Sequence, residues 1–284
     1  MGGAFPIVRH PAPGARTPIV VSVPHYGTDP LPHVTREDYC EPRFETFAYG
    51  FADTFAGDVY GDLHAHGATV LATPVSRMFV DVNRRRDDFE HHDGAVRSSR
   101  GVVRTHTMRG VPIFARPLTP AELEARLRAL YDPYYATLDR LLAERRAAHG
   151  YAILLDAHTG SPRRMGDHEV ILGTRRDSTC APALTGMVAA IFTRHGFTVH
   201  ENVSGYTGGN IVSTYGRPHA RVHALQLEIN ASLLMTTSRE ELIALITRGG
   251  VPGKAEATIT RLRDCLRETL AALPSAVAAE KDAP

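Results

Sequence analysis

Short apolar runs that stop abruptly at polar residues are the feature that most constrains the fold of this chain. They occupy residues 18–27, 67–77, 151–160 and 223–232, and they read PIVVSVPHYG, GATVLATPVSR, YAILLDAHTG and HALQLEINAS. Runs this short, rich in β-branched residues and almost continuously apolar, are typical of strands buried on both faces of a sheet. We therefore predict a sheet that is covered by helices on both sides.

Helical patterns lie between these runs. Residues 119–150 begin with Thr119 and Glu122 at the spacing of a capping box, and Gly150 is a plausible end of the helical pattern. Pro133 is expected to divide or kink this segment, because proline removes a backbone donor. Similar patterns predict a helix at 181–196, a short strand at 197–203, and two helices between Ser238 and Val277, the second fraying at Pro274.

Strands that alternate with helices predict an α/β fold with a mixed but largely parallel sheet flanked by helices. A length of 284 residues allows one large domain or two ordinary ones, and no internal repeat divides the chain. We predict a single catalytic domain over residues 1–284, with loose order at 1–17 and 278–284. Residues 82–117 show no sustained period, and long polar connections of this kind are usually functional or mobile.

The overall charge excludes some classes of partner. Lys plus Arg number 32 and Asp plus Glu number 31, so there is no general attraction to nucleic acid or to anionic membranes. The chain contains no run of about 18 apolar residues and no signal-like start, so we expect a cytoplasmic protein. The 3 cysteines form no CxxC pair, which indicates neither a disulfide framework nor a thiolate zinc site.

Two histidines stand at the polar ends of the predicted strands. Ligands of open α/β sheets bind beyond the carboxyl ends of the strands, so His25 and His158 are expected to meet in one cleft. Two imidazoles there could bind a divalent metal, and Zn²⁺ suits a site of nitrogen and carboxylate ligands. The third ligand stays open among nearby carboxylates, and Asp156 is better placed to orient an imidazole from outside. The other carboxylates are Asp58, Asp62 and Asp29.

Glu228 is a carboxylate inside an apolar strand, in the sequence LQLEIN. Burial of this group would be costly unless it is paired, hydrogen bonded or used in catalysis. We interpret it as a general base beside the metal. A salt bridge to an arginine such as Arg221 is an equally weighted alternative.

The segment SRMFVDVNRRR supplies groups that could bind an anionic substrate: Arg77, Asp81, Asn83 and Arg84. An arginine binds a carboxylate through two parallel hydrogen bonds, and a neighbouring asparagine can hold the other oxygen. Arg84 and Asn83 are therefore predicted to bind a substrate carboxylate, while Arg77 meets a second carboxylate or an oxyanion. The alternative for the arginine triplet is a solvated basic run.

The sequence GYTGGN supplies a further part of the predicted substrate site. Gly208 and Gly209 would let the backbone approach a ligand closely, and Tyr206 could form a pocket wall. A plain turn is the alternative. Tyr134 and Tyr135, in a helical context, are interpreted as packing residues rather than as substrate contacts.

With these residues assembled, the chain resembles the N-formylglutamate amidohydrolase family. The matching segments, in the order of the family and spanning about residues 19–236, are VPHYG, GATVLATPVSRMFVDVNR, LTPAELEARLRALYDPYYATL, LLDAHTGSP and GGNIVSTYGRPHARVHALQLEIN. The resemblance implies a zinc hydrolase with one Zn²⁺ per chain and a phosphorylase/hydrolase-like fold similar to that of zinc carboxypeptidases. It also implies that His25 and His158 are metal ligands, that Glu228 is the general base, and that Asn83 and Arg84 hold the substrate carboxylate.

This chain departs from the related patterns at several positions. Carboxypeptidase-like sequences have Glu three residues after the first His, where this chain has Thr28, so the third ligand must come from elsewhere and we choose Asp58. The family commonly has Ser at the positions of Tyr26 and Thr159, and His at the position of Tyr135. These changes bear on the substrate more than on the reaction.

The expected function is metal-dependent hydrolysis of the amide of a small-molecule N-acyl amino acid, with N-formyl-L-glutamate favoured. Another zinc deacylase or a small peptidase would use the same groups. Two further alternatives are a non-catalytic protein that binds a metal or an amino acid, and a protein whose histidines and carboxylates only satisfy one another.

Overall fold

The computed structural model describes residues 5–40, 50–108, 110–248 and 250–281. Within them the chain forms a sheet of seven strands in the order β1-β3-β2-β6-β9-β7-β8, together with a separate hairpin, β4-β5. The strands of the sheet are β1 (Ile7–Arg9), β2 (Ile19–Val23), β3 (Thr69–Ala72), β6 (Ala152–Gly160), β7 (Val170–Gly173), β8 (Val199–Glu201) and β9 (Val222–Asn230), and the hairpin comprises β4 (Glu90–His92) and β5 (Ala95–Arg97).

The middle of the sheet is parallel, as the buried apolar runs predict. β3, β2, β6 and β9 run side by side in one direction, whereas β1 is antiparallel to β3 and β7 is antiparallel to β9. The mixed, mostly parallel sheet flanked by helices is thereby confirmed. Its parallel strands end at one edge, which brings their polar carboxyl ends together.

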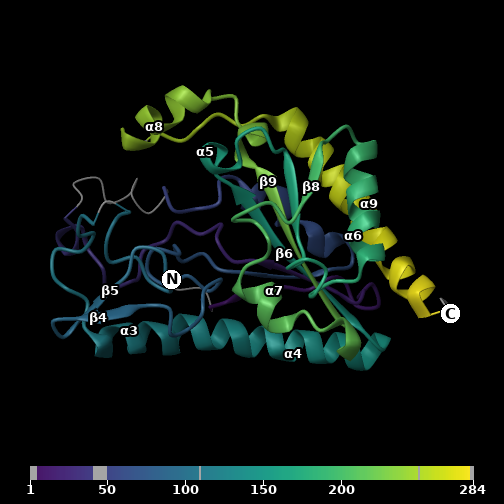
Figure 1. Ribbon diagram of the computed structural model, residues 1–284, viewed down its shortest axis with the longest axis horizontal. Coiled ribbons are helices and arrows are strands. Elements are labelled where there is room, and N and C mark those ends of the chain that lie inside the picture. The colour runs from purple at the N-terminus through teal and green to yellow at the C-terminus, as the bar shows by residue number, and fades with distance from the viewer. Residues whose placement is uncertain (1–4, 41–49, 109, 249, 282–284) are drawn as a thin grey trace.

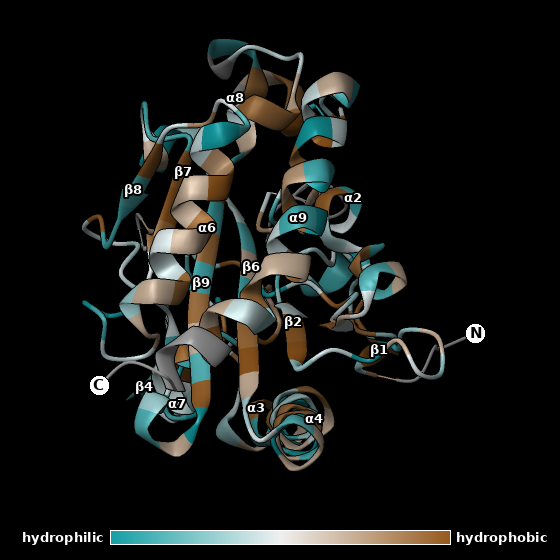
Figure 2. Ribbon diagram, turned by 90° about the vertical axis from the view of Figure 1, so that its right-hand side faces the viewer, coloured by the Kyte–Doolittle hydropathy of each residue, from teal (hydrophilic) through white to brown (hydrophobic). Residues whose placement is uncertain are grey.

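Helices cover both faces of the sheet (Figures 1 and 2). α2 (Ala56–Tyr60), α6 (Pro182–Arg194) and α9 (Glu256–Lys281) enclose a largely apolar core on one face. The other face packs against α3 (Pro120–Arg126), η3 (Leu127–Tyr131), α4 (Asp132–His149) and α7 (Asn210–Tyr215). Shorter elements are η1 (Arg36–Asp38), η2 (Leu63–His66), α5 (Pro162–Met165), η4 (Pro218–Ala220), η5 (Ala231–Leu234) and α8 (Arg239–Thr247).

The rod formed by α3, η3 and α4 follows from local sequence. Thr119 Oγ1 accepts a hydrogen bond from Glu122 N at 3.2 Å, and the Glu122 carboxylate returns one to Thr119 N at 2.9 Å. Gly150, with φ of 80°, ends the rod. Pro133 lies in the first turn of α4, directly after the π-helical turn η3. The capping box and the division near Pro133 are therefore confirmed.

The ends of the chain are more ordered than expected. Within residues 1–17, Ile7–Arg9 pair with β3 as an edge strand. At the other end α9 passes through Pro274 and continues to Lys281, so the predicted fraying there is wrong. The reason is packing, since Ala276 and Val277 are buried in the core beyond the proline. Residues 1–4 and 282–284 lie outside the described part of the chain.

The connection 82–117 contains more structure than its polar sequence indicates. It includes the β4-β5 hairpin, and Val96, Val102 and Ile113 are buried in the core beside α3. β7 and α7 were also not predicted from the sequence, because each is a short segment whose burial depends on β9 and β6. No helix in the described residues is long and apolar enough to cross a membrane.

Candidate active site

The register of the sheet builds the site on its α4 side. In parallel pairs, directly aligned residues point to the same face, and His158 of β6 is aligned with Glu228 of β9. One step closer to the strand starts, Asp156 is aligned with Ser22 of β2 and with Gln226 of β9. Two adjacent rows of buried polar side chains therefore lie between the middle of β6 and β9 and their carboxyl ends.

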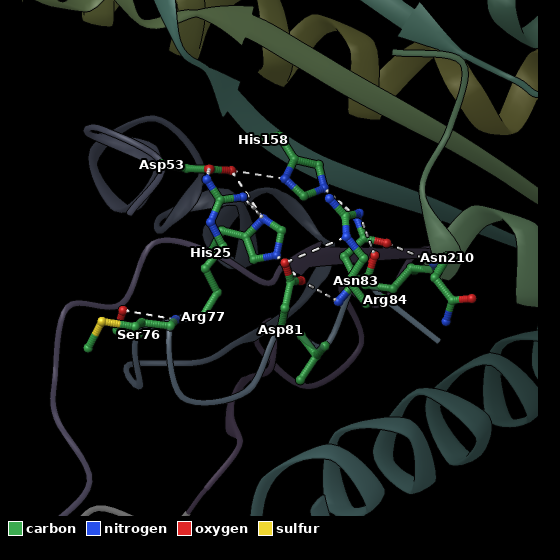
Figure 3. Close-up of polar contacts among 12 residues, drawn as sticks. His25, Asp53, Ser76, Arg77, Asp81, Asn83, Arg84, His158 and Asn210 are labelled. Carbon is green, nitrogen blue, oxygen red and sulfur yellow. Dashed lines mark hydrogen bonds and ion pairs between the residues drawn. The ribbon is translucent and has the colours of Figure 1, made fainter. Parts of the chain in front are cut away.

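Two imidazoles and one carboxylate converge beside these rows (Figure 3). The rings of His25 and His158 have centroids 4.9 Å apart. Asp53 Oδ2 lies 2.9 Å from His158 Nδ1 and 3.7 Å from His25 Nδ1. Among the described residues, these are the histidine, cysteine and acidic side chains that could share a metal ion, with ligand atoms within 4.8 Å of one another.

The other nitrogen of each ring is held by a second carboxylate. His25 Nε2 lies 2.8 Å from Asp81 Oδ1, and His158 Nε2 lies 3.1 Å from Asp156 Oδ2. A carboxylate on the far nitrogen fixes the orientation of the ring and is typical of histidines that bind metals. Both Nδ1 atoms are thus directed toward Asp53.

The third potential ligand is Asp53, not Asp58 as we expected. Asp58 lies in α2 and its Oδ1 is 2.5 Å from Lys254 Nζ, outside the His25 group. Asp62 also lies outside the group, 3.9 Å from Arg263 Nε, and so does Asp29.

The loop before α2 places Asp53 through backbone contacts. Asp53 N donates to the carbonyl of His25 at 2.8 Å, and the Asp53 carboxylate accepts from Thr159 N at 3.3 Å. The available sequence signal was an acid in the apolar stretch between Phe51 and Phe55. That signal is weak, because Asp53 does not follow any of the predicted strands.

The side-chain amide of Asn83, which we expected to bind substrate, forms hydrogen bonds within the protein. Its Nδ2 lies 3.0 Å from both Asp156 Oδ2 and His158 Nε2, and its Oδ1 accepts from Ile211 N at 2.9 Å. The bonds to Asp156 and from Ile211 take up one donor and one acceptor site of this buried amide. Asn83 therefore holds Asp156, the carboxylate that faces the His158 ring.

The two predicted arginines both lie beside the site. Arg77 Nη1 is 3.0 Å from His25 Nδ1, and its Nη2 is 3.5 Å from Asp53 Oδ1. Arg84 donates to the carbonyls of Arg100 at 2.8 Å and Asn83 at 3.1 Å. Their side chains are 27% and 36% exposed, so each guanidinium retains a surface that a ligand can reach.

Arg104 is a member of this cluster that sequence reasoning missed. It is buried, and it donates to Asp81 Oδ2 at 3.2 Å and to the carbonyl of Ser99 at 2.8 Å. Burial lowers the pKa of Arg104 to about 10, although the Asp81 charge opposes that change. Arg104 lies in the connection 82–117, where the sequence has no helical or strand period, so nothing distinguished this arginine from its neighbours.

Glu228 is buried beside His158. The alternative that we considered for it was a salt bridge to Arg221. Glu228 Oε1 accepts from Gln226 Nε2 at 2.5 Å, and the described residues show no ion pair between Glu228 and Arg221. Burial raises the pKa of Glu228, and the nearby His158 only partly opposes this change. A carboxyl with a raised pKa suits proton transfer near neutral pH.

The glycine pair packs against the site's own residues. The Gly209 amide donates to Gln226 Oε1, and a Cβ atom on Gly209 would lie 2.5 Å from Asn83 Oδ1. Gly208 has a φ of 122°, which side chains rarely allow. Tyr206 is half-buried, and burial together with the charge of Glu228 raises its pKa. Tyr206 thus belongs to the surroundings of Glu228, whereas the glycines permit close backbone packing.

Four carboxylates are buried in the cluster. Asp53, Asp81, Asp156 and Glu228 are each at most 7% exposed. Although burial opposes ionisation, Arg77 with the two histidines holds the pKa of Asp53 well below its usual range. Burial of four carboxylates is costly without compensating positive charge, and Arg77, Arg84 and Arg104 supply part of that charge beside Asp53 and Asp81. Two imidazole nitrogens and a carboxylate form a donor set that fits Zn²⁺.

Comparisons with known proteins agree on one family. The sequence profile of the N-formylglutamate amidohydrolase family matches residues 17–235. A protein named N-formylglutamate deformylase from Pseudomonas aeruginosa is 31% identical over 266 residues, which cover 90% of this chain and 94% of that protein. A protein of the same name from Pseudomonas putida is 31% identical over 241 residues, which cover 80% of this chain and 87% of that protein.

Solved structures share the fold. The crystal structure of N-formylglutamate amidohydrolase from Ralstonia eutropha has a TM-score of 0.76 at 24% identity, covering 98% of this chain and 99% of that one. A gene product of Agrobacterium tumefaciens has a TM-score of 0.66 at 18% identity, covering 99% and 97%. At these identities the likeness concerns the fold alone.

Proposed function

Because the chain belongs to the N-formylglutamate amidohydrolase family, we propose that it hydrolyses the amide of an N-acyl amino acid with one Zn²⁺ at His25, Asp53 and His158. N-formyl-L-glutamate is the favoured substrate, and formate and glutamate are the products. The proposal is supported by the names of the two Pseudomonas relatives and by the donor set of the site. The observation that carries it is the convergence of both Nδ1 atoms on Asp53, next to the buried carboxyl of Glu228.

Glu228 is the proposed general base. When bound, Zn²⁺ supplies Lewis acidity, which makes water a stronger nucleophile at neutral pH. Glu228 takes the proton of the attacking water and passes it to the nitrogen of the leaving amine. The raised pKa of this carboxyl supports both steps, because the group can accept and release a proton without a large difference in free energy.

The arginines provide the proposed anion contacts. Arg77 adjoins the imidazole pair, so it can stabilise negative charge on the acyl oxygen as that charge develops. Arg84 keeps part of its guanidinium exposed and is proposed to bind a carboxylate of the amino acid. Asn83 is proposed to hold Asp156 against the His158 ring instead, because its amide is already hydrogen bonded to Asp156 and Ile211.

Metal analysis and parallel hydrolysis assays test this function on the whole protein purified without added zinc. About one equivalent of zinc and fastest turnover of N-formylglutamate are expected. Faster turnover of acetylated amino acids or dipeptides would instead identify another deacylase or a peptidase. Bound metal without turnover would indicate a binding protein. Less than about a tenth of an equivalent, with no binding on titration, would mean that the polar groups only satisfy one another.

The substitution Glu228→Gln separates metal binding from catalysis. It should retain zinc and lower kcat by about 10² to 10⁴ fold, the usual contribution of a positioned acid or base. Glu201→Gln, at the exposed end of β8, is the matched control and should change neither quantity. Undiminished turnover in Glu228→Gln would remove this residue from the mechanism.

A further inference from the structure

Two tyrosine hydroxyls bind the backbone on either side of Asn83. Tyr135 donates to the carbonyl of Val82 at 2.9 Å, and Tyr131 donates to the carbonyl of Arg84 at 2.9 Å. The two rings are stacked, with centroids 4.5 Å apart and an interplanar angle of 16°. The carbonyls of Val82 and Arg84, the residues on either side of Asn83, are therefore held by a stacked aromatic pair.

The helical rod presents these tyrosines through an unusual turn. Tyr131 is the last residue of the π-helical turn η3, and Tyr135 lies in the first turns of α4. Asp132 N bonds to the carbonyl of Leu127, five residues earlier, and Pro133, which follows it, has no backbone N–H to donate. Single π-helical turns of this kind occur frequently at functional sites.

A third tyrosine of the same stretch reaches the neighbouring carboxylate. The Tyr134 hydroxyl lies 2.9 Å from Ser22 Oγ, and Ser22 Oγ donates to Asp156 Oδ1 at 3.1 Å. Tyr134 is fully buried, and burial raises the pKa of the Tyr131, Tyr134 and Tyr135 phenols. Each hydroxyl therefore stays protonated and able to donate.

Both chains of contacts end at the Asp156 carboxylate. Its Oδ2 accepts from Asn83 Nδ2 at 3.0 Å and lies 3.1 Å from His158 Nε2, and the opposite nitrogen of the ring, Nδ1, faces Asp53 at 2.9 Å. We propose that Tyr131, Tyr134 and Tyr135 are positioning residues, which fix Asn83 and Asp156 and thereby direct His158 Nδ1 toward the metal position. The proposal rests on the proposed function for the identity of the metal.

The residues that complete the arrangement come from a distant part of the chain. Asn210 Nδ2 donates to the Tyr135 hydroxyl at 2.7 Å, and Ile211 N, at the start of α7, donates to Asn83 Oδ1 at 2.9 Å. The Asn83 side chain is thus held by α7, and the carbonyls of its two neighbours are held by the tyrosines. A merely apolar packing role would not require these hydroxyls.

The test compares the double variant Tyr131→Phe/Tyr135→Phe with Tyr151→Phe. The control loses the same kind of bond, because the Tyr151 hydroxyl donates to the carbonyl of Pro274 at 3.2 Å, away from the site. Three quantities are measured: the thermal midpoint, the Zn²⁺ dissociation constant by competition with a chelator, and the ¹⁵N shifts of the His158 ring in metal-free protein. Tyr134→Phe and the two single variants serve as milder versions if the double variant folds poorly.

A positioning role predicts altered His158 ring shifts and roughly tenfold weaker Zn²⁺ binding in the double variant, at the lower end of the range for residues that support metal ligands. Tyr151→Phe should change the thermal midpoint alone. Unchanged ring shifts and zinc affinity in the double variant would overturn the proposal. If wild-type protein binds no zinc, the proposed function fails, and the ring shifts still decide whether the tyrosines position His158.

Discussion

On the face of the sheet that packs against α6 and α9, β6 contributes only apolar side chains over Ile153, Leu155 and Ala157. On the face toward α4, the same strand contributes Asp156 and His158. The apolar face is stabilised by area removed from water and needs no particular orientation of its groups. The polar face is stable only when each buried donor and acceptor has its partner, which ties its geometry to distant residues.

The largest expected effect is on Zn²⁺ binding, when Asp53 on the polar side of the sheet is replaced. Asp53→Asn removes a charged ligand between the imidazoles and should weaken Zn²⁺ binding by more than about 100-fold, beyond the range for supporting residues. Asp58→Asn is the matched control, since Asp58 pairs with Lys254 at the surface. Chelator competition measures both. A larger loss in Asp58→Asn than in Asp53→Asn would restore our original choice of ligand.

Breaking the apolar face should instead lower stability and leave the chemistry intact. Leu155→Ala removes a side chain that is 1% exposed in the core beside α6 and α9, and should cost about 2 to 5 kcal/mol of unfolding free energy. Denaturant unfolding measures this loss. Below the unfolding transition, zinc affinity per folded molecule should match that of wild type. A parallel fall in zinc affinity would show that the two faces are not independent.

The pH dependence of activity sharpens the role of Glu228. Its pKa is raised above the ordinary 4.5, so the carboxylate needed as base is present above the raised pKa and is lost as pH falls through it. Below that point kcat/KM should fall about tenfold per pH unit, since each unit of pH changes the base fraction tenfold. The acid limb should therefore lie above pH 4.5. A profile that is flat down to pH 4.5 would contradict this assignment.

The smallest effect is expected far from both faces, at the start of α3. Thr119→Ala removes the side chain that accepts from Glu122 N, which should cost about 1 kcal/mol, as loss of a helix cap usually does. Thermal unfolding measures the change, and zinc affinity should not move. If zinc affinity fell with this substitution, the start of the rod would have to influence the tyrosines that it carries.

Sequence reasoning selected His25, His158 and Glu228 as candidates because each stands near the end of an apolar strand, a local pattern with a known spatial meaning. It did not find Asp53 as the acid beside the imidazoles. The Asp53 and His158 side chains are 105 residues apart in the chain, and no period or cap links them. It also gave Asn83 a ligand-binding role, because the sequence does not show that Ile211 and Asp156 already use its amide.

The sequence alone determined the buried strands, the capping box at Thr119, the end of the rod at Gly150 and the division near Pro133, because each depends on neighbouring residues. Only the tertiary structure decided that β7 runs antiparallel, that α9 continues past Pro274, and which carboxylate faces the imidazoles. Those outcomes depend on contacts between distant segments. Burial and hydrogen bonding between distant segments stabilise these arrangements, and the local sequence pattern does not show which segments will meet.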